Sequence, residues 1–143
     1  MDVVKIGIIG AGQMGGGIAQ VAAQSGIDVV IVDAERAWAD RGRKKIEAAL
    51  EKLVQKGKLK PEERAGAMAR IGVADNYAGF EDCDLVVEAA TENQELKKKI
   101  FQELDKAVKP GAILASNTSS ISITLLGAQT SRSEKVIGMH FIN

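Results

Sequence analysis

A short glycine-rich loop near the amino terminus restricts the possible folds of this chain more than any other feature. Residues 5–20 read KIGIIGAGQMGGGIAQ, so Gly10, Gly12 and Gly15 follow an apolar stretch with the spacing G-x-G-x-x-G. Between a strand and a helix, the first glycine permits a tight turn, the second lets the backbone approach a pyrophosphate, and the third allows close helix–strand packing. The helix N-terminus then attracts the anion through its free N–H groups. We therefore expect a dinucleotide site here; the alternative is a glycine turn without a ligand.

An acidic residue at the end of the next predicted strand indicates which dinucleotide binds. Asp33 lies eighteen residues after Gly15, where a carboxylate can hydrogen-bond the adenosine ribose hydroxyls. The same charge would repel the extra phosphate of NADP, so we expect NAD as the cofactor. Arg36 is close in sequence and weakens this preference slightly.

Short β-branched runs alternate with longer helical patterns along the chain. This alternation is typical of βαβ units and a parallel sheet, and the runs are mostly apolar, as in strands buried on both faces. We predict strands at Val3–Ile9, Asp28–Val32, Arg70–Val73, Leu85–Glu88, Ala112–Ser116 and Val136–Met139. We predict helices at Met14–Ser25 (ended by Gly26), at Ala37–Lys56, from Pro61 onward, at Gln94–Val108 and, as a short one, at Ser122–Ala128. The predicted fold class is α/β: one Rossmann-type, doubly wound domain over residues 1–143 with a mainly parallel sheet.

The connection between the second and third predicted strands is unusually long. More than thirty residues separate Val32 from Arg70, whereas a crossover needs only about 10–12, so we predict a helical hairpin inserted after the second strand. Between Arg36 and Lys60, nine residues are basic and three are acidic. This excess indicates either a solvated helix face or a surface for a phosphate-bearing ligand.

Composition argues against several other classes of protein. The formal net charge is zero, so nothing global draws the chain to nucleic acid or to an anionic membrane. No apolar run approaches the length of a membrane span, and the amino terminus does not read as a secretory signal. The single cysteine, Cys83, excludes an intramolecular disulfide and a cysteine-based zinc site, and we expect it in the core. We expect the protein in the cytoplasm.

Polar residues follow three of the predicted strands, at the edge where open parallel sheets bind ligands. Taken singly, several of them could be helix caps. Together they suit the interconversion of an alcohol and a ketone: an imidazole is a well-matched base for the hydroxyl proton, a serine can hold the oxygen, and the cofactor carries the hydride. On this reasoning His140 is either catalytic or a stray imidazole near the chain end. The residues are Glu88, Glu92, Lys97, Asn117, Thr118, Ser119, Ser120 and His140.

The chain resembles the 3-hydroxyacyl-CoA dehydrogenase family, and within it the bacterial 3-hydroxybutyryl-CoA dehydrogenases. The stretches that carry the resemblance are IGIIGAGQMGGGIAQ, DLVVEAATEN, ILASNTSSISIT and KVIGMHFIN, in this order along almost the whole chain. The resemblance implies the N-terminal Rossmann domain of an enzyme that oxidises L-3-hydroxyacyl-CoA to 3-ketoacyl-CoA with NAD.

The resemblance also implies roles for individual residues. Ser119 would hold the substrate oxygen beside the nicotinamide, and His140 would be the general base. Lys56, inside the basic hairpin, would contact the acyl-CoA. The residues expected to bind NAD are Gly10, Gly12, Gln13, Met14, Gly15, Asp33, Glu92, Lys97, Asn117, Ser119 and Asn143.

Two features depart from the family's pattern. Ile142 stands where the motif H-F-F-N-P usually has an aromatic residue, which we interpret as a packing change. The family's glutamate partner of the histidine would lie beyond Asn143, as would its all-helical C-terminal domain, which supplies a further catalytic asparagine and most dimer contacts. We therefore predict that this chain alone binds NAD with little or no turnover. The alternatives are a stand-alone NAD-binding sensor or assembly module, and another dehydrogenase with a similar loop, such as a 6-phosphogluconate or 3-hydroxyisobutyrate type.

Overall fold

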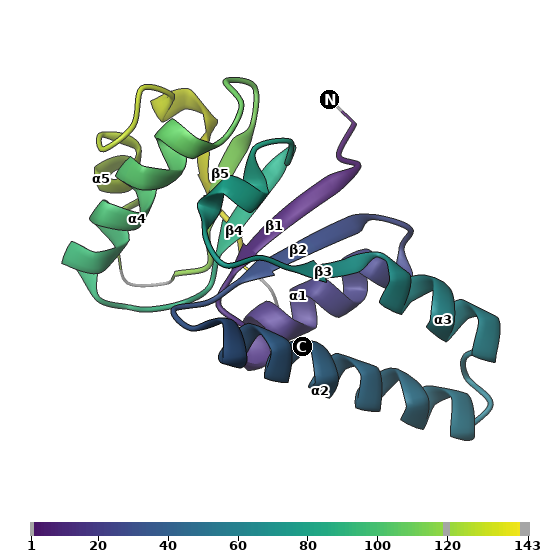
Figure 1. Ribbon diagram of the computed structural model, residues 1–143. Helices are drawn as coiled ribbons and strands as arrows, with labels where there is room; N and C mark the ends of the chain where they lie inside the picture. Colours follow the sequence, from purple (N-terminus) through teal and green to yellow (C-terminus); the bar gives the residue numbers. More distant parts are fainter. Residues whose placement is uncertain (1, 119–120, 141–143) are drawn as a thin grey trace.

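The computed structural model describes residues 2–118 and 121–140 of the chain. Within these residues the strands form one six-stranded sheet in the order β3-β2-β1-β4-β5-β6. Every neighbouring pair is parallel (Figure 1), so the predicted doubly wound, parallel sheet is confirmed. The strands are β1 (Lys5–Ile9), β2 (Asp28–Val32), β3 (Ile71–Val73), β4 (Leu85–Glu88), β5 (Ile113–Ser116) and β6 (Val136–Gly138).

The strand predictions differ from the structure only at strand ends. β1 begins at Lys5 and not at Val3, because the N–H groups of Val4 and Lys5 donate to the Asp84 carboxylate, at 2.9 and 3.1 Å, and not to a neighbouring strand. The Lys109 ammonium, before β5, donates to the same carboxylate at 2.7 Å. Together these donors lower the pKa of Asp84 to about 2. One carboxylate thus joins the segments that lead into β1, β4 and β5.

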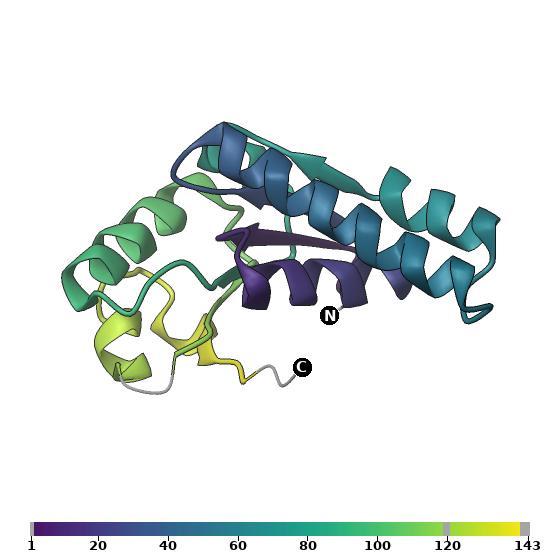
Figure 2. The same ribbon diagram turned by 90° about the horizontal axis from the view of Figure 1, so that it is seen from below.

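Helices cover both faces of the sheet (Figure 2). On one face pack α1 (Gln13–Gln24), α2 (Arg36–Gln55) and α3 (Pro61–Ala69). On the other pack α4 (Gln94–Ala107) and α5 (Ile123–Gly127). The predicted helices are present with ends shifted by one residue at most, and the structure adds two short 3₁₀ helices, η1 (Tyr77–Phe80) and η2 (Ser133–Lys135). Among the described helices none is long and apolar enough to cross a membrane.

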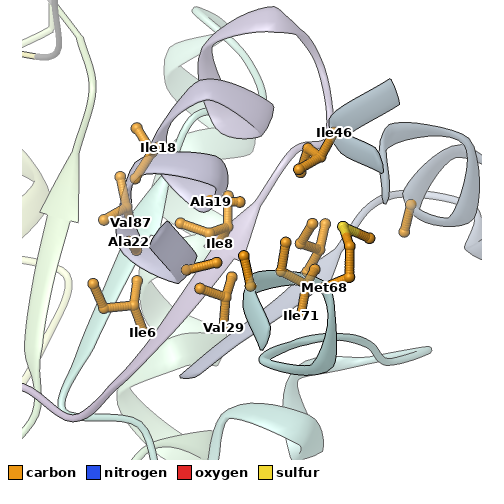
Figure 3. Packing of buried hydrophobic residues seen from close by; sticks show 14 of the residues in the cluster. Ile6, Ile8, Ile18, Ala19, Ala22, Val29, Ile46, Met68, Ile71 and Val87 are labelled. Carbon is orange, nitrogen blue, oxygen red and sulfur yellow. The ribbon is translucent and has the colours of Figure 1, made fainter. Parts of the chain in front are cut away.

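Two apolar cores lie on the two faces of the sheet. Ile8 and Ile9 point into different cores, because successive side chains of a strand alternate between faces. In the first core, Ile8 lies beside Ala19 of α1, and Val29 and Ile46 of α2 belong to the same cluster (Figure 3). The second core contains Cys83, as expected, and burial raises the pKa of its thiol to about 11. A thiol of this kind stays protonated and inert near neutral pH.

α2 and α3 form the predicted helical hairpin, which projects away from the sheet (Figure 1). The turn between them contains Gly57 at φ 72°, a left-handed conformation that favours glycine. Across the hairpin, Arg64 of α3 lies 3.0 Å from Glu51 and 3.9 Å from Glu47 of α2. Two of the three acidic residues of the basic segment are therefore neutralised inside the hairpin.

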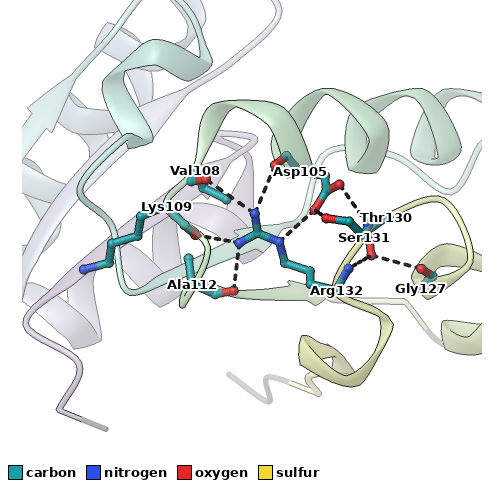
Figure 4. A network of polar contacts seen from close by, with 8 residues as sticks. All are labelled: Asp105, Val108, Lys109, Ala112, Gly127, Thr130, Ser131 and Arg132. Carbon is teal, nitrogen blue, oxygen red and sulfur yellow. Dashed lines mark hydrogen bonds and ion pairs between the residues drawn. The ribbon is translucent and has the colours of Figure 1, made fainter.

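A buried arginine ties α4 to the last two strands (Figure 4). Arg132, before β6, is 6% exposed and donates to Asp105 Oδ1 at 2.8 Å. It also donates to the carbonyl oxygens of Lys109 and Ala112, at 2.6 and 3.2 Å. Burial raises the pKa of Asp105, but hydrogen bonds from Ser131 and Arg132 outweigh it, and the pKa lies below its usual value. This network fixes the edge of the sheet that β6 occupies.

Candidate cofactor site and active site

The glycine loop joins β1 to α1 at the carboxyl edge of the sheet. Gly10 has φ 102°, and a Cβ there would lie 2.8 Å from the carbonyl oxygen of Ala89, so conformation and space both require glycine. A Cβ on Gly15 would overlap the carbonyl oxygen of Gly10, which is the close helix–strand contact expected of the third glycine. At Gly12 nothing lies within 4 Å of where a Cβ would be, so the loop is open to a ligand there.

The N-terminus of α1 presents backbone donors at this opening. Gly12 is the N-cap, and no side chain in the described residues caps the helix. The Gly16 N–H donates to the Gly12 carbonyl at 2.8 Å. The preceding N–H groups, at Gln13, Met14 and Gly15, belong to the first turn, which has no intrahelical acceptors in an α-helix. A phosphate here would accept from them and would lie at the positive end of the helix dipole.

Asp33, at the end of β2, is held by the backbone on both sides. Its Oδ2 accepts from the Ala11 N–H at 2.8 Å and its Oδ1 from the Ala34 N–H at 2.7 Å. A cavity of about 320 Å³ extends from Asp33 between Trp38 and Tyr77 to the turn after β4. A planar base suits such an apolar, aromatic cavity, and its ribose would then meet the Asp33 carboxylate.

The cations beside Asp33 differ from the sequence expectation. Arg36 does not lie against Asp33, because two other aspartates engage it at 3.4 and 3.1 Å. Instead, Arg41 and Lys45 of α2 line a cavity of about 170 Å³ together with Asp33 and Trp38. Sequence reasoning missed these two residues, although their helical spacing from Trp38 indicates a shared face.

A further cavity, of about 390 Å³, lies where the glycine loop, β4 and β5 meet. Met14, Glu92 and Asn117, expected at the NAD site from three separate elements, all line it. The Thr118 hydroxyl donates to Glu92 Oε2 at 2.8 Å, and the Asn117 N–H donates to the carbonyl oxygen of Glu88 at 2.9 Å. The structure therefore brings these predicted residues together around one open space.

Lys97 does not line the crevice, contrary to the expectation. The side chain is 0% exposed and its ammonium pairs with the Glu88 carboxylate, which is also 0% exposed. Ser116 Oγ donates to Glu88 Oε1 at 2.9 Å, and the Ala90 and Thr91 N–H groups donate to Oε2 at 2.8 and 3.2 Å. The cause is that Glu88 points inward, and its buried charge needs a buried cation. A contact between Lys97 and NAD stays a prediction.

His140 follows β6 at the same carboxyl edge. Gly138 is paired with Ser116, and the Met139 N–H donates to the Ser116 carbonyl oxygen at 3.0 Å. The imidazole is exposed, at the edge where Asn117 leaves β5. Two of the predicted site residues, Ser119 and Asn143, lie outside the described residues, and their roles stay predictions.

Comparison with known proteins decides the family. Residues 5–143 match the model of a family described as 3-hydroxyacyl-CoA dehydrogenase, NAD binding domain. The chain belongs to this family. NAD is therefore the cofactor of this domain, in agreement with the glycine loop and Asp33.

Relatives of this 3-hydroxyacyl-CoA dehydrogenase domain are longer than the chain, several of them about twice as long. The 3-hydroxybutyryl-CoA dehydrogenase of Bradyrhizobium diazoefficiens is 49% identical over 139 residues, which are 97% of this chain and 47% of that protein. The crystal structure of (S)-3-hydroxybutyryl-CoA dehydrogenase from Ralstonia eutropha has a TM-score of 0.95 at 46% identity, covering 99% of this chain and 50% of that one. For 3-hydroxybutyryl-CoA dehydrogenase from Escherichia coli K12 the TM-score is 0.97 at 38% identity, covering 100% and 30%. The chain spans about half the length of the curated relatives it matches first.

In this domain of the 3-hydroxyacyl-CoA dehydrogenase family, exposed cations form a row along α2. Arg41, Lys45, Lys52 and Lys56 are four, seven and four residues apart and all exposed, so they share one helix face. Lys45 also lines a cavity of about 460 Å³ with Gly12 and the small residues of α1. The row thus begins beside the glycine loop and ends at Lys56, the residue expected to contact the acyl-CoA.

Proposed function

We propose that this chain is the cofactor-binding part of an NAD-dependent dehydrogenase that interconverts L-3-hydroxyacyl-CoA and 3-ketoacyl-CoA, with 3-hydroxybutyryl-CoA as the favoured substrate. The observation that carries the proposal is the meeting of three features at one sheet edge: an open glycine loop, the cavity beside Asn117, and the exposed His140. The names of the relatives from Bradyrhizobium diazoefficiens and Ralstonia eutropha support the same reaction.

The proposed chemistry divides one oxidation between a base and the cofactor. His140 takes the proton of the substrate's C3 hydroxyl group, and Ser119 donates a hydrogen bond that holds the oxygen. NAD, when bound, accepts the hydride from C3, so the hydroxyl carbon becomes a carbonyl carbon. The exposed position of His140 next to the residues leaving β5 fits a base that must reach a bound substrate.

We assign the binding of NAD to the loop and to the carboxyl ends of three strands. The first turn of α1 would donate to the pyrophosphate, Asp33 would accept from the adenosine ribose, and the cavity beside Asn117 would hold the nicotinamide end. The residues assigned to the cofactor are Gly10, Gly12, Gln13, Met14, Gly15, Asp33, Glu92, Asn117, Ser119 and Asn143, while the buried Lys97 acts only indirectly, through Glu88.

We assign the phosphates of coenzyme A to the cation row of α2. Arg64 pairs with Glu51 and Glu47 on the α3 side of the hairpin. The residues of the exposed row also have no acidic neighbours in i+4 positions, so the row keeps its positive charge. A phosphorylated substrate that passes the glycine loop would meet Lys45 first and Lys56 last. Replacing Lys52 and Lys56 by glutamate should weaken CoA binding at low salt, while Lys106→Glu on α4 should not.

Turnover, in this proposal, requires a second, helical domain beyond these 143 residues, which pairs a carboxylate with His140, excludes water and supplies most dimer contacts. We further propose that the protein works in the cytoplasm, since its single cysteine is a buried thiol and acyl-CoA and NAD meet there.

A domain-completion assay tests the proposal. The chain alone, given NADH and acetoacetyl-CoA, should consume almost no NADH. The same chain fused to the C-terminal half of the Bradyrhizobium diazoefficiens relative should consume NADH, and His140→Ala in the fusion should abolish turnover without weakening NAD binding. A fusion that binds NAD and stays inert would contradict the dehydrogenase proposal and favour a binding module.

A further inference from the structure

We propose that Gly42, in the second turn of α2, is a positioning residue that holds the glycine loop where the pyrophosphate of the dinucleotide can bind. The inference concerns cofactor binding by this chain and not the dehydrogenase reaction, so the two can fail separately. It also assigns the inserted hairpin a role in shaping the cofactor site, in addition to its cation row.

The contact between α2 and the loop has no room for a side chain. Gly42 is buried, and a Cβ built on it would lie 2.5 Å from the Cβ and 2.8 Å from the carbonyl oxygen of Ala11. Ordinary contacts of a Cβ fall at 3.4–4 Å. The helix therefore rests directly on the backbone of the loop, at the residue between Gly10 and Gly12.

Clearance, and not backbone conformation, requires glycine at this position. The glycines with positive φ in the described residues are Gly10, Gly26 and Gly57, so Gly42 has a conformation that other residues adopt. Glycine inside a helix is unfavourable relative to alanine. At Gly66 of α3, by contrast, the nearest atom to a built Cβ is a guanidinium nitrogen of Arg70 at 3.8 Å, so alanine fits there.

The loop is held from three sides, each time by a residue outside the strand–loop–helix motif of β1, the loop and α1. From the sheet, Asp33 Oδ2 accepts the Ala11 N–H at 2.8 Å. From the turn after β4, the carbonyl oxygen of Ala89 lies against Gly10. From the hairpin, Gly42 lies against Ala11. A methyl group at Gly42 must push either α2 outward or the loop toward the space that the pyrophosphate needs.

Binding of NAD fragments to the 143-residue chain tests this inference. Gly42→Ala should raise the Kd for NAD and for ADP-ribose about tenfold or more, while the Kd for adenosine, which has no pyrophosphate, should change less than about twofold. Gly66→Ala is the matched control, and it should leave all three values within about twofold. Calorimetric titration and a urea melt on each variant separate weaker binding from unfolding.

A compensating substitution makes the test specific to the contact. Ala11→Gly in the Gly42→Ala background removes the atom at 2.5 Å and leaves the carbonyl oxygen at 2.8 Å, so it should recover part of the lost affinity for ADP-ribose. If Gly42→Ala does not fold, Ala11→Val crowds the same contact from the loop side and should show the same selective loss. Unchanged NAD affinity in the crowded variant, equal losses for adenosine and ADP-ribose, or no recovery with Ala11→Gly would each overturn the inference.

Discussion

Lys97 and Glu88 form an ion pair that solvent does not reach, since both side chains are 0% exposed. Glu88 receives donors on both oxygens: Lys97 and Ser116 on Oε1, and the N–H groups of Ala90 and Thr91 on Oε2. Ala90 and Thr91 line both the cavity beside Asp33 and the cavity beside Asn117. The pair therefore fixes the turn that separates the two halves of the proposed dinucleotide site.

Removing only the cation of this pair should be costly. Lys97→Met leaves the Glu88 carboxylate buried without its cation, and the free energy of unfolding should fall by about 3–5 kcal/mol. Replacing both partners by Met and Leu should recover a large part of the loss, because no buried charge then remains. Urea unfolding measures both, with the partly exposed Lys98→Met as control. A double variant as unstable as Lys97→Met would contradict this account.

Asp33 should set the choice between NAD and NADP. Asp33→Asn keeps an oxygen that can accept the Ala11 N–H but removes the negative charge next to Arg41 and Lys45. The ratio of NADP to NAD affinity should rise about tenfold or more. Titrations with both cofactors measure it, and Asp28→Asn, at the other end of β2, is the matched control. An equal loss for both cofactors would argue against the ribose contact.

Arg132 should matter for stability and not for the cofactor. Arg132→Met leaves Asp105 without its cation and several carbonyl oxygens without the guanidinium donor, so the free energy of unfolding should fall by about 3 kcal/mol. The residue does not touch the glycine loop, so the folded fraction should keep its NAD affinity. Thermal melts and cofactor titration together test this, with the more exposed Lys135→Met as control. A loss no larger than that of the control would show that the network contributes little.

Because of Asp84, the stability of the fold should depend on pH in the acid range. Its pKa is lowered to about 2 by the hydrogen bond from Lys109 and by the N–H groups of Val4 and Lys5. The carboxylate therefore stabilises the fold fully at pH values above its ordinary pKa of 3.8, and this contribution disappears as the pH falls toward about 2. The Tm of the native chain should exceed that of Asp84→Asn at neutral pH, and the difference should shrink steadily below about pH 4. A difference independent of pH would contradict the assigned ionisation.

Local patterns in the sequence were enough to predict most of the fold. The glycine spacing, the apolar strands and the long crossover indicated the parallel sheet and the hairpin, and Gly26 ends α1 at φ 89° as expected. These features depend on neighbours in the sequence or on simple periodicity. Contacts between residues that are distant in the sequence were harder to predict. Nothing near Lys97 reveals that Glu88 turns inward, and nothing in α2 reveals that Gly42 meets Ala11.

The residues of the candidate site were likewise predictable only in part. Met14, Glu92 and Asn117 could be placed together because the carboxyl ends of parallel strands share one edge. The cations that face Asp33 could not, because Arg36 is nearer in sequence but is engaged by Asp40 and Asp75. Which of several arginines on a helix reaches a carboxylate depends on ion pairs that sequence spacing does not rank.

A crystal structure of the chain with NAD would show directly whether the glycine loop, Asp33 and the edge beside His140 hold one dinucleotide. We expect the pyrophosphate within about 3 Å of the first-turn N–H groups of α1, the adenosine ribose on Asp33, and the nicotinamide in the cavity beside Asn117 with His140 at its edge. A dinucleotide bound elsewhere on the chain, or a nicotinamide that points away from His140, would contradict it.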